Sequence, residues 1–242
     1  MKEPKDYIIF PLDLPDLDQA AAYVKVLKNH VGLFKVGLEL FISHGPEVLK
    51  IIRDTGAAGI FLDLKLHDIP ATVKRAFRAA SRFSPELLTV HCDEGADTLR
   101  AIAEENPTGT KILAVTVLTS LDQKNLYRLG YRDEYVNDLS RLVLLRAKIA
   151  MEAGCHGIVC SGHEVARVKA ELGKDLIAVT PGIRPQWSLV DHDDQKRVVT
   201  PRVAVAMGAD YIVVGRPIRD AKDPVDAARQ VAEEIAQGLN PS

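Results

Sequence analysis

The stretch FLDLKLHDIP, residues 61–70, alternates charged and apolar side chains within an otherwise apolar run. In a strand, Asp63 and Lys65 project to one side while Leu62 and Leu64 project to the other. Burying an unpaired charge is costly, so such groups are solvated, paired with one another, or held for chemistry. The stretch therefore predicts a strand with an apolar outer face packed by helices and an ionic face turned into the mouth of a barrel.

Similar short apolar runs recur along the chain, and each is followed by a segment with helical spacing. The predicted strands are 7–10, 33–37, 58–65, 87–91, 111–118, 157–161, 176–182 and 211–215. The predicted helices are 16–30, 45–56, 71–83, 95–106, 134–154, 162–173, 198–208 and 223–239. Eight alternating units in a chain of 242 residues favour the α/β class and a (β/α)8 TIM barrel, with residues 1–242 forming a single domain.

An open doubly wound sheet is the main alternative fold. It would place a GxGxxG turn after the first strand, but the segment FPLDLPD, residues 10–16, contains no glycine. The dinucleotide-binding interpretation is therefore disfavoured.

Composition narrows the classes of partner. With 31 basic and 33 acidic residues the formal net charge is -2, and aromatic residues make up only 5%, so we expect no nucleic-acid binding. No apolar run reaches 18 residues and the first residues lack a signal-peptide core, so we expect no membrane association and a cytoplasmic location. Cys92, Cys155 and Cys160 lack metal-site spacing, and we expect them to be reduced and buried.

Polar residues gather where the predicted strands end, which in a TIM barrel is the rim that carries the active site. Lys35 ends the second strand, and with Asp63, Lys65 and Asp68 it would make a cluster of alternating charge. Flanking carboxylates raise the pKa of a lysine, which suits Lys65 to proton donation rather than to Schiff-base chemistry. Alternatively, these four residues form only a structural ion-pair network at the top of the barrel. For His67 and His91 we expect structural rather than catalytic roles.

The loops after the last two strands have the features of a phosphate site, which TIM barrels often carry there. They read TPGIRP, residues 180–185, and VVGRPIRD, residues 213–220, in which Pro217 suits the first turn of a short helix. Residues 186–201 between them are long and polar enough to form a lid, with Gln195 as its expected ligand. Alternatively, Gly215 only ends a strand and Arg216 is a surface charge.

These motifs together resemble the orotidine 5′-phosphate decarboxylases of the bacterial type. The resemblance rests on FKVGLELF (34–41), FLDLKLHDIPATV (61–73), VTVLTSL (115–121), DDQKRVVTP (193–201) and VVGRPI (213–218), in addition to the TPGIRP segment. It implies decarboxylation of orotidine 5′-monophosphate to UMP in de novo pyrimidine biosynthesis by a homodimer with shared active sites, without metal or other cofactor.

The same resemblance implies catalytic roles for four residues. Lys65 would protonate C6 of the pyrimidine as carbon dioxide leaves, and Asp63 would lie beside the substrate carboxylate. Lys35 would orient it, and Asp68 would enter from the other subunit.

Substrate-binding roles also follow from the resemblance. Asp13 and Lys35 would bind one ribose hydroxyl, and Asp68 and Thr72 of the partner would bind the other. The remaining contacts would be Thr119 and Ser120 near the pyrimidine and Arg184, Gln195, Gly215 and Arg216 at the phosphate.

Two other functions remain open on the sequence. A Mg²⁺-dependent sugar-phosphate decarboxylase or synthase of the same superfamily would hold its metal on carboxylates, and Asp13, Glu39 and Asp63 are available near the rim. A non-catalytic nucleotide-binding protein would have lost at least one member of the charged cluster, and none of the four is replaced.

Overall fold

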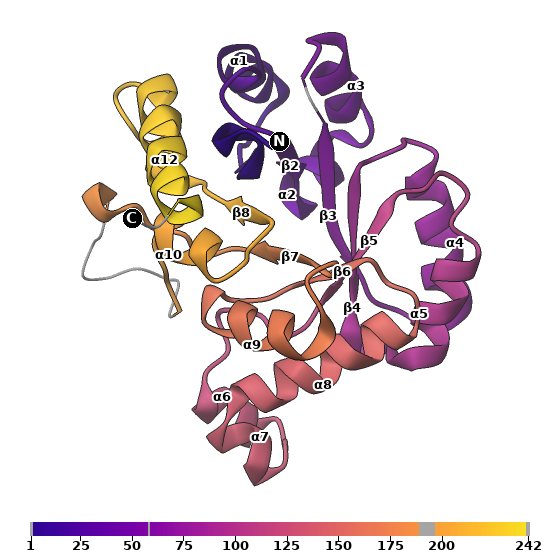
Figure 1. Cartoon of the computed structure of the whole chain (residues 1–242). Coiled ribbons are helices and arrows are strands. Elements are labelled where there is room, and N and C mark those ends of the chain that lie inside the picture. The colour runs from indigo at the N-terminus through magenta and orange to yellow at the C-terminus, as the bar shows by residue number, and fades with distance from the viewer. Residues whose placement is uncertain (1, 58, 189–196, 241–242) are drawn as a thin grey trace.

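Eight parallel strands close into a barrel in the computed structural model, which describes residues 2–57, 59–188 and 197–240 (Figure 1). Each strand pairs with the next one along the chain, and β8 pairs with β1 to complete the closure. The strands are β1 (Ile8–Pro11), β2 (Leu33–Val36), β3 (Ile60–Leu66), β4 (Leu87–His91), β5 (Lys111–Val115), β6 (Gly157–Val159), β7 (Ile177–Thr180) and β8 (Tyr211–Val213). The predicted (β/α)8 barrel is confirmed.

Helices surround the barrel and connect successive strands (Figure 1). The α-helices are α1 (Leu17–Leu27), α2 (Leu38–His44), α3 (Glu47–Asp54), α4 (Pro70–Ser81), α5 (Gly95–Glu104), α6 (Gln123–Arg128), α7 (Asp133–Asn137), α8 (Leu139–Glu152), α9 (Gly162–Leu172), α10 (Pro201–Ala206), α11 (Arg216–Arg219) and α12 (Pro224–Leu239). Short 3₁₀ turns occur at η1 (Pro4–Tyr7), η2 (Cys92–Glu94) and η3 (Gln186–Ser188). None of these helices in the described ranges is long and apolar enough to cross a membrane.

One predicted helix is wrong in its extent. Residues 134–154 were expected to form a single helix, but the chain breaks at Asp138 into α7 and α8. The Asp138 carboxylate accepts a hydrogen bond from the Ser140 main-chain N–H, which caps α8 and favours a new start there. The helices α2 and α6 were not predicted, whereas the short helix expected at Pro217 is present as α11.

Two apolar clusters lie on opposite faces of the strands, as alternation along each strand requires. The inner cluster fills the barrel and includes Phe61 with Ile9, Leu33, Leu87, Leu113 and Val179. The larger outer cluster contains Leu62 and packs the strands against the helices. Because Phe61 points inward and Leu62 outward, Asp63 is directed inward, above the apolar filling.

The three cysteines are free and buried, as the sequence predicted. Burial raises the pKa of each thiol, to about 12 for Cys155, so the reactive thiolate is disfavoured. They serve as small apolar side chains of the core.

Candidate active site

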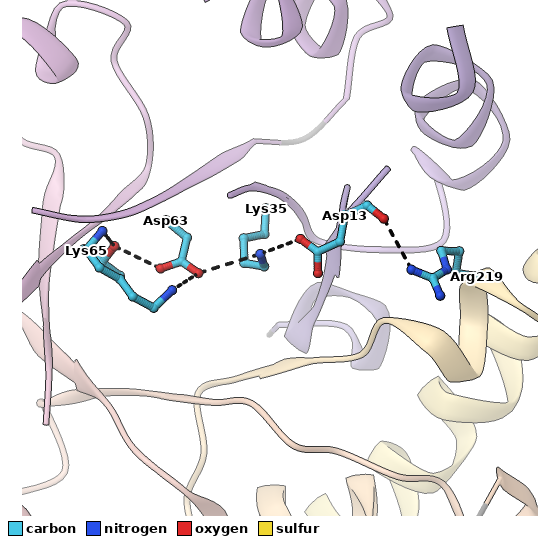
Figure 2. Close-up of polar contacts among 6 residues, drawn as sticks. Asp13, Lys35, Asp63, Lys65 and Arg219 are labelled. Atoms are coloured by element: carbon cyan, nitrogen blue, oxygen red, sulfur yellow. Dashed lines mark hydrogen bonds and ion pairs between the residues drawn. The ribbon is translucent and has the colours of Figure 1, made fainter. Parts of the chain in front are cut away.

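A chain of alternating charges crosses the mouth of the barrel from Asp13 to Lys65 (Figure 2). The Lys35 ammonium donates to Asp13 Oδ1 at 3.0 Å and lies 3.7 Å from Asp63 Oδ2. The Lys65 ammonium donates to the same Asp63 oxygen at 2.7 Å. Asp63 is 8% exposed and thus receives two cations in a buried position.

The β3 strand reaches this arrangement through an irregularity. Leu62 pairs with Leu88 and Leu66 pairs with Val90, so four steps along β3 match two along β4. Lys65 lies in the bulged segment with φ at 47°, a left-handed conformation that residues other than glycine rarely adopt. The convergence of Asp63 and Lys65 therefore depends on a bulge that re-aims the lysine, beyond the simple two-residue alternation expected from the sequence.

A threonine that the sequence reasoning did not identify connects this bulge to the carboxylate. The hydroxyl of Thr89 on β4 accepts the main-chain N–H of Lys65 at 2.8 Å and donates to Asp63 Oδ1 at 3.0 Å. Thr89 is fully buried. The available signal was the position of Thr89 two residues after Leu87, a member of the inner cluster, because this spacing places a polar side chain on the inward face of the strand.

The charge state of Asp63 follows from these contacts. Burial alone would raise the pKa of this carboxyl, because desolvation disfavours the anion. The positive charges of Lys35 and Lys65, with hydrogen bonds from Lys65 and Thr89, outweigh burial and hold the pKa below its ordinary value. Asp63 is therefore an anion at neutral pH.

Next to this chain lies a cavity of about 280 Å³ with mostly apolar walls. Lys35, Asp63 and Lys65 form its charged edge. Thr119 and Ser120 line it as well, among the apolar residues Phe61, Val115, Val117, Leu118, Val159, Cys160, Pro181 and Val213. We call this cavity the apolar compartment, and its mostly apolar lining with a charged edge suits a small ring with polar substituents.

A second cavity, of about 250 Å³, adjoins the first and shares Lys35, Pro181 and Val213 with it. Its lining is cationic, with the side chains of Arg184, Arg216 and Arg219 beside Gly182 and Gly215. We call it the cationic compartment. Guanidinium groups and glycine backbone in such a concavity suit a phosphate.

Local structure explains how these residues come together. A Cβ atom on Gly215 would lie 3.0 Å from Pro11 Cγ, so glycine allows the end of β8 to approach β1 closely. Arg184 is 7% exposed, and its main-chain N–H donates to Val199 O at 2.9 Å. This hydrogen bond fixes the segment that carries Arg184 against the residues that precede α10.

Arg219 is a second residue that the sequence reasoning missed. Its guanidinium donates to the main-chain oxygen of Asp13 at 3.3 Å (Figure 2) and pairs with Asp220 at 2.6 Å. Arg219 follows Arg216 by three residues, so the short helix predicted at Pro217 places both side chains on the same face. This spacing was the signal in the sequence for Arg219.

The remaining candidates lie elsewhere. Asp68 and Thr72 are in the loop after β3 and the first turn of α4, and neither is among the residues that line the two compartments. Asp68 is exposed, and its Oδ1 accepts the Ile69 N–H at 2.6 Å. Gln195 lies outside the described residues.

The histidines belong to a separate polar network. His91 Nδ1 lies 3.0 Å from Asp93 Oδ2, and Asp93 also pairs with the buried Arg146 of α8. The rings of His67 and His91 are 5.2 Å apart. Neither histidine lines either compartment, and a structural role for both stays a prediction.

Of the three carboxylates considered for a metal-dependent rival, Asp13 and Asp63 lie on either side of a lysine, and Glu39 is not among the residues that line the two compartments. The Lys35 ammonium lies between Asp13 and Asp63, in the position that a cation shared by these two carboxylates would take. Within residues 2–57, 59–188 and 197–240, no three His, Cys, Asp or Glu side chains group in a way that could hold a metal ion.

Comparison with known proteins identifies the family. The model of the orotidine 5′-phosphate decarboxylase / HUMPS family matches residues 6–231. Curated orotidine 5′-phosphate decarboxylases from Desulfosudis oleivorans and Thermobifida fusca are 49% and 45% identical to this chain, covering 98% and 97% of it and 96% and 98% of their own lengths.

A solved structure agrees with this assignment. Orotidine 5′-phosphate decarboxylase from Lactobacillus acidophilus superposes with a TM-score of 0.80 at 34% sequence identity, covering 94% of this chain and 98% of that one. The resemblance predicted from the sequence is confirmed, and with it the prediction of a decarboxylase-family enzyme. On the matched length and identity, the chain belongs to the orotidine 5′-phosphate decarboxylase / HUMPS family.

Proposed function

We propose that this protein converts orotidine 5′-monophosphate to UMP and carbon dioxide in de novo pyrimidine biosynthesis, without a metal or organic cofactor. The observation that carries the proposal is the Lys65 ammonium held 2.7 Å from the buried Asp63 carboxylate, at the edge of an apolar compartment that adjoins a cationic one. The curated relatives that span nearly the whole chain bear the name of this activity.

The chemistry explains why fixed charge is needed. When the bond between C6 and the carboxylate breaks, its electron pair stays on an sp² carbon, with no ring carbonyl placed to accept it as an ordinary enolate. Lys65 donates its proton to that pair, a C6–H bond forms, and the neutral amine regains a proton from solvent. Preorganised cations and a positioned acid take the place of the missing electron sink.

Asp63 and Lys35 set up this step. The Asp63 anion orients the Lys65 ammonium, and Lys35 connects Asp63 to Asp13. A substrate carboxylate placed beside Asp63 meets a like charge, which its loss as neutral carbon dioxide relieves. In the same geometry Asp13 and Lys35 are available to a ribose hydroxyl at the border of the two compartments.

The two compartments match the two ends of a nucleotide. The pyrimidine would lie among the apolar walls with Thr119 and Ser120 at its polar edge, and the phosphate would lie against Arg184, Gly215 and Arg216. Enzymes lower barriers by roughly 8 to 23 kcal/mol, and binding energy from a remote group is one source of this stabilisation. A contribution of Gln195 to phosphate binding stays a prediction.

A Mg²⁺-dependent sugar-phosphate enzyme is the alternative within the same superfamily. It is less well supported, because the Lys35 ammonium lies between Asp13 and Asp63, two of the three carboxylates that were available for the metal. Turnover of orotidine 5′-monophosphate after exhaustive treatment with EDTA tests this directly. Full activity favours the proposal, whereas activity lost and then restored by Mg²⁺ favours the alternative.

We also propose a homodimer in which Asp68 and Thr72 of each subunit complete the partner's site. Both residues follow β3 at the rim of the barrel, outside the compartments of their own chain. Ile69 is 66% exposed beside them, and Leu38, Ile42 and Leu118 are exposed on other loops and helices that follow strand ends. An apolar rim of this kind favours association.

A cytoplasmic location is part of the same proposal. Free, buried cysteines are usual in proteins of a reducing compartment, and the substrate is a phosphorylated intermediate.

Lys65→Ala should abolish turnover while leaving nucleotide binding nearly intact. Loss of a positioned acid costs about 10²- to 10⁴-fold in rate. Lys65 lines the apolar compartment but not the cationic one, so the contacts proposed for the phosphate remain. Steady-state kinetics and calorimetric titration with UMP measure the two effects, with the exposed Lys50→Ala on α3 as a control. Equal loss of activity and UMP binding would indicate a structural lysine.

Arg216→Ala should raise KM for orotidine 5′-monophosphate about 10- to 100-fold, because a charged hydrogen bond to phosphate is removed. The slow turnover of orotidine, which lacks the phosphate, should not change. Arg202→Ala, an exposed arginine on α10, is the matched control. An unchanged KM for the phosphorylated substrate would contradict the phosphate assignment.

Mixed dimers test the shared site. Asp68→Asn and Lys65→Ala subunits are each expected to be inactive as homodimers, but a heterodimer carries one site free of both changes. Activity should therefore return toward half of the wild-type value per heterodimer, measured on tandem-tagged material purified for both subunits. Absence of recovery in verified heterodimers would mean that Asp68 acts within its own chain, and full activity of the Asp68→Asn homodimer would mean that Asp68 has no catalytic role.

A further inference from the structure

The single hydroxyl group of Thr89 contacts two residues of the charged edge, Asp63 and Lys65. Its Oγ1 accepts the main-chain N–H of Lys65 at 2.8 Å and donates to Asp63 Oδ1 at 3.0 Å, while Lys65 Nζ bonds the other carboxylate oxygen at 2.7 Å. Three groups therefore form a closed loop: hydroxyl, carboxylate, ammonium side chain and back through the lysine backbone. The hydroxyl is fully buried, so water does not compete for these bonds.

The backbone of Lys65 depends on this contact. Its φ of 47° is unfavourable for a residue with a Cβ atom, and the bulge takes the segment out of regular register with β4. In a regular parallel ladder the lysine N–H would meet a main-chain carbonyl, whereas here a side chain from β4 receives it. Strained conformations of this kind persist only where the surroundings determine them, and they are concentrated at active sites.

We propose that Thr89 is a positioning residue for the decarboxylation, which presets the separation and orientation of Asp63 and Lys65 before substrate binds. This inference rests on the function proposed above. Thr89 lines neither compartment, so it acts through its two partners and not through contact with the nucleotide.

Because of the location of Thr89, loss of its hydroxyl should affect the chemical step and not nucleotide binding. The residues assigned to the phosphate and to the pyrimidine edge lie on other elements, after β5, β7 and β8. Loss of the Thr89 hydroxyl should therefore lower kcat with little change in KM or in UMP affinity, which is the pattern of an interaction expressed in the transition state.

The pH profile provides a second signature. The charged groups that face Asp63 are Lys65 from its own strand and Lys35 from β2, with Asp13 behind Lys35, and Thr89 is its partner from β4. Removing the hydroxyl takes away one of the hydrogen bonds that lower the pKa of Asp63. Its pKa should rise, and the acid limb of the kcat profile should move to higher pH, since protonated Asp63 no longer holds the ammonium.

Thr89→Val, which keeps the shape and removes the hydroxyl, tests the inference. A hydrogen bond to a charged group corresponds to about a tenfold to hundredfold effect, so kcat should fall by that factor, with KM and UMP affinity within about threefold of wild type. Thr89→Ser and Thr89→Ala make the same comparison at smaller volume, should Val pack poorly: Ser should keep activity within about threefold, and Ala should lose it as Val does.

Ser81→Ala on α4 is the control, because it deletes a buried hydroxyl that has no hydrogen-bond partner among the described residues. It should leave kcat and the pH profile unchanged. A crystal structure of Thr89→Val without ligand gives a readout independent of activity, and should show φ of Lys65 or the 2.7 Å contact with Asp63 altered.

The inference is overturned if Thr89→Val and Thr89→Ala match wild type in kcat, or if Ser loses as much activity as Ala. It is also overturned if kcat and UMP affinity fall together without a shift in the pH profile, which would indicate a purely structural threonine. Failure of the wild-type protein to release carbon dioxide from orotidine 5′-monophosphate would instead count against the proposed function, while the ligand-free structure of Thr89→Val would still test the positioning role.

Discussion

The Asp63 carboxylate, buried at the mouth of the barrel, is the constraint on which the site depends. A buried anion is tolerated only where opposite charge and hydrogen bonds replace water, and Lys35, Lys65 and Thr89 supply them. Buried ion pairs seldom add net stability, because desolvation offsets most of the attraction. The stability of the fold therefore comes from the two apolar clusters, and the buried charges are kept for their chemical role.

The barrel turns this local requirement into a nucleotide-sized site. Parallel strands bring all their carboxyl ends to one rim, so Lys35, Asp63 and Lys65 from neighbouring strands meet there without long connections. The ends of β7 and β8 contribute arginine and glycine to a second compartment beside the first. Under the proposed function, a substrate anchored by its phosphate in the cationic compartment would have its ring directed toward the charged edge.

Much of this could be predicted from the sequence, because it depends on local pattern. Apolar runs alternating with helical spacing indicated the barrel, and Pro217 indicated the short helix at Arg216. The break at Asp138 and the bulge at Lys65 were not predicted, because each depends on a tertiary or capping interaction that periodicity does not record. Thr89 was missed for the same reason: its importance lies in what the neighbouring strand places against it.

A crystal structure of the protein with a tightly bound UMP analogue would show whether Lys65 faces the reacting carbon. We expect the Lys65 ammonium within about 3.5 Å of C6 of the pyrimidine, as a near-attack arrangement requires, with its contact to Asp63 preserved. A lysine that points away from the ring into solvent, or a nucleotide bound with its base in the cationic compartment, would contradict this expectation.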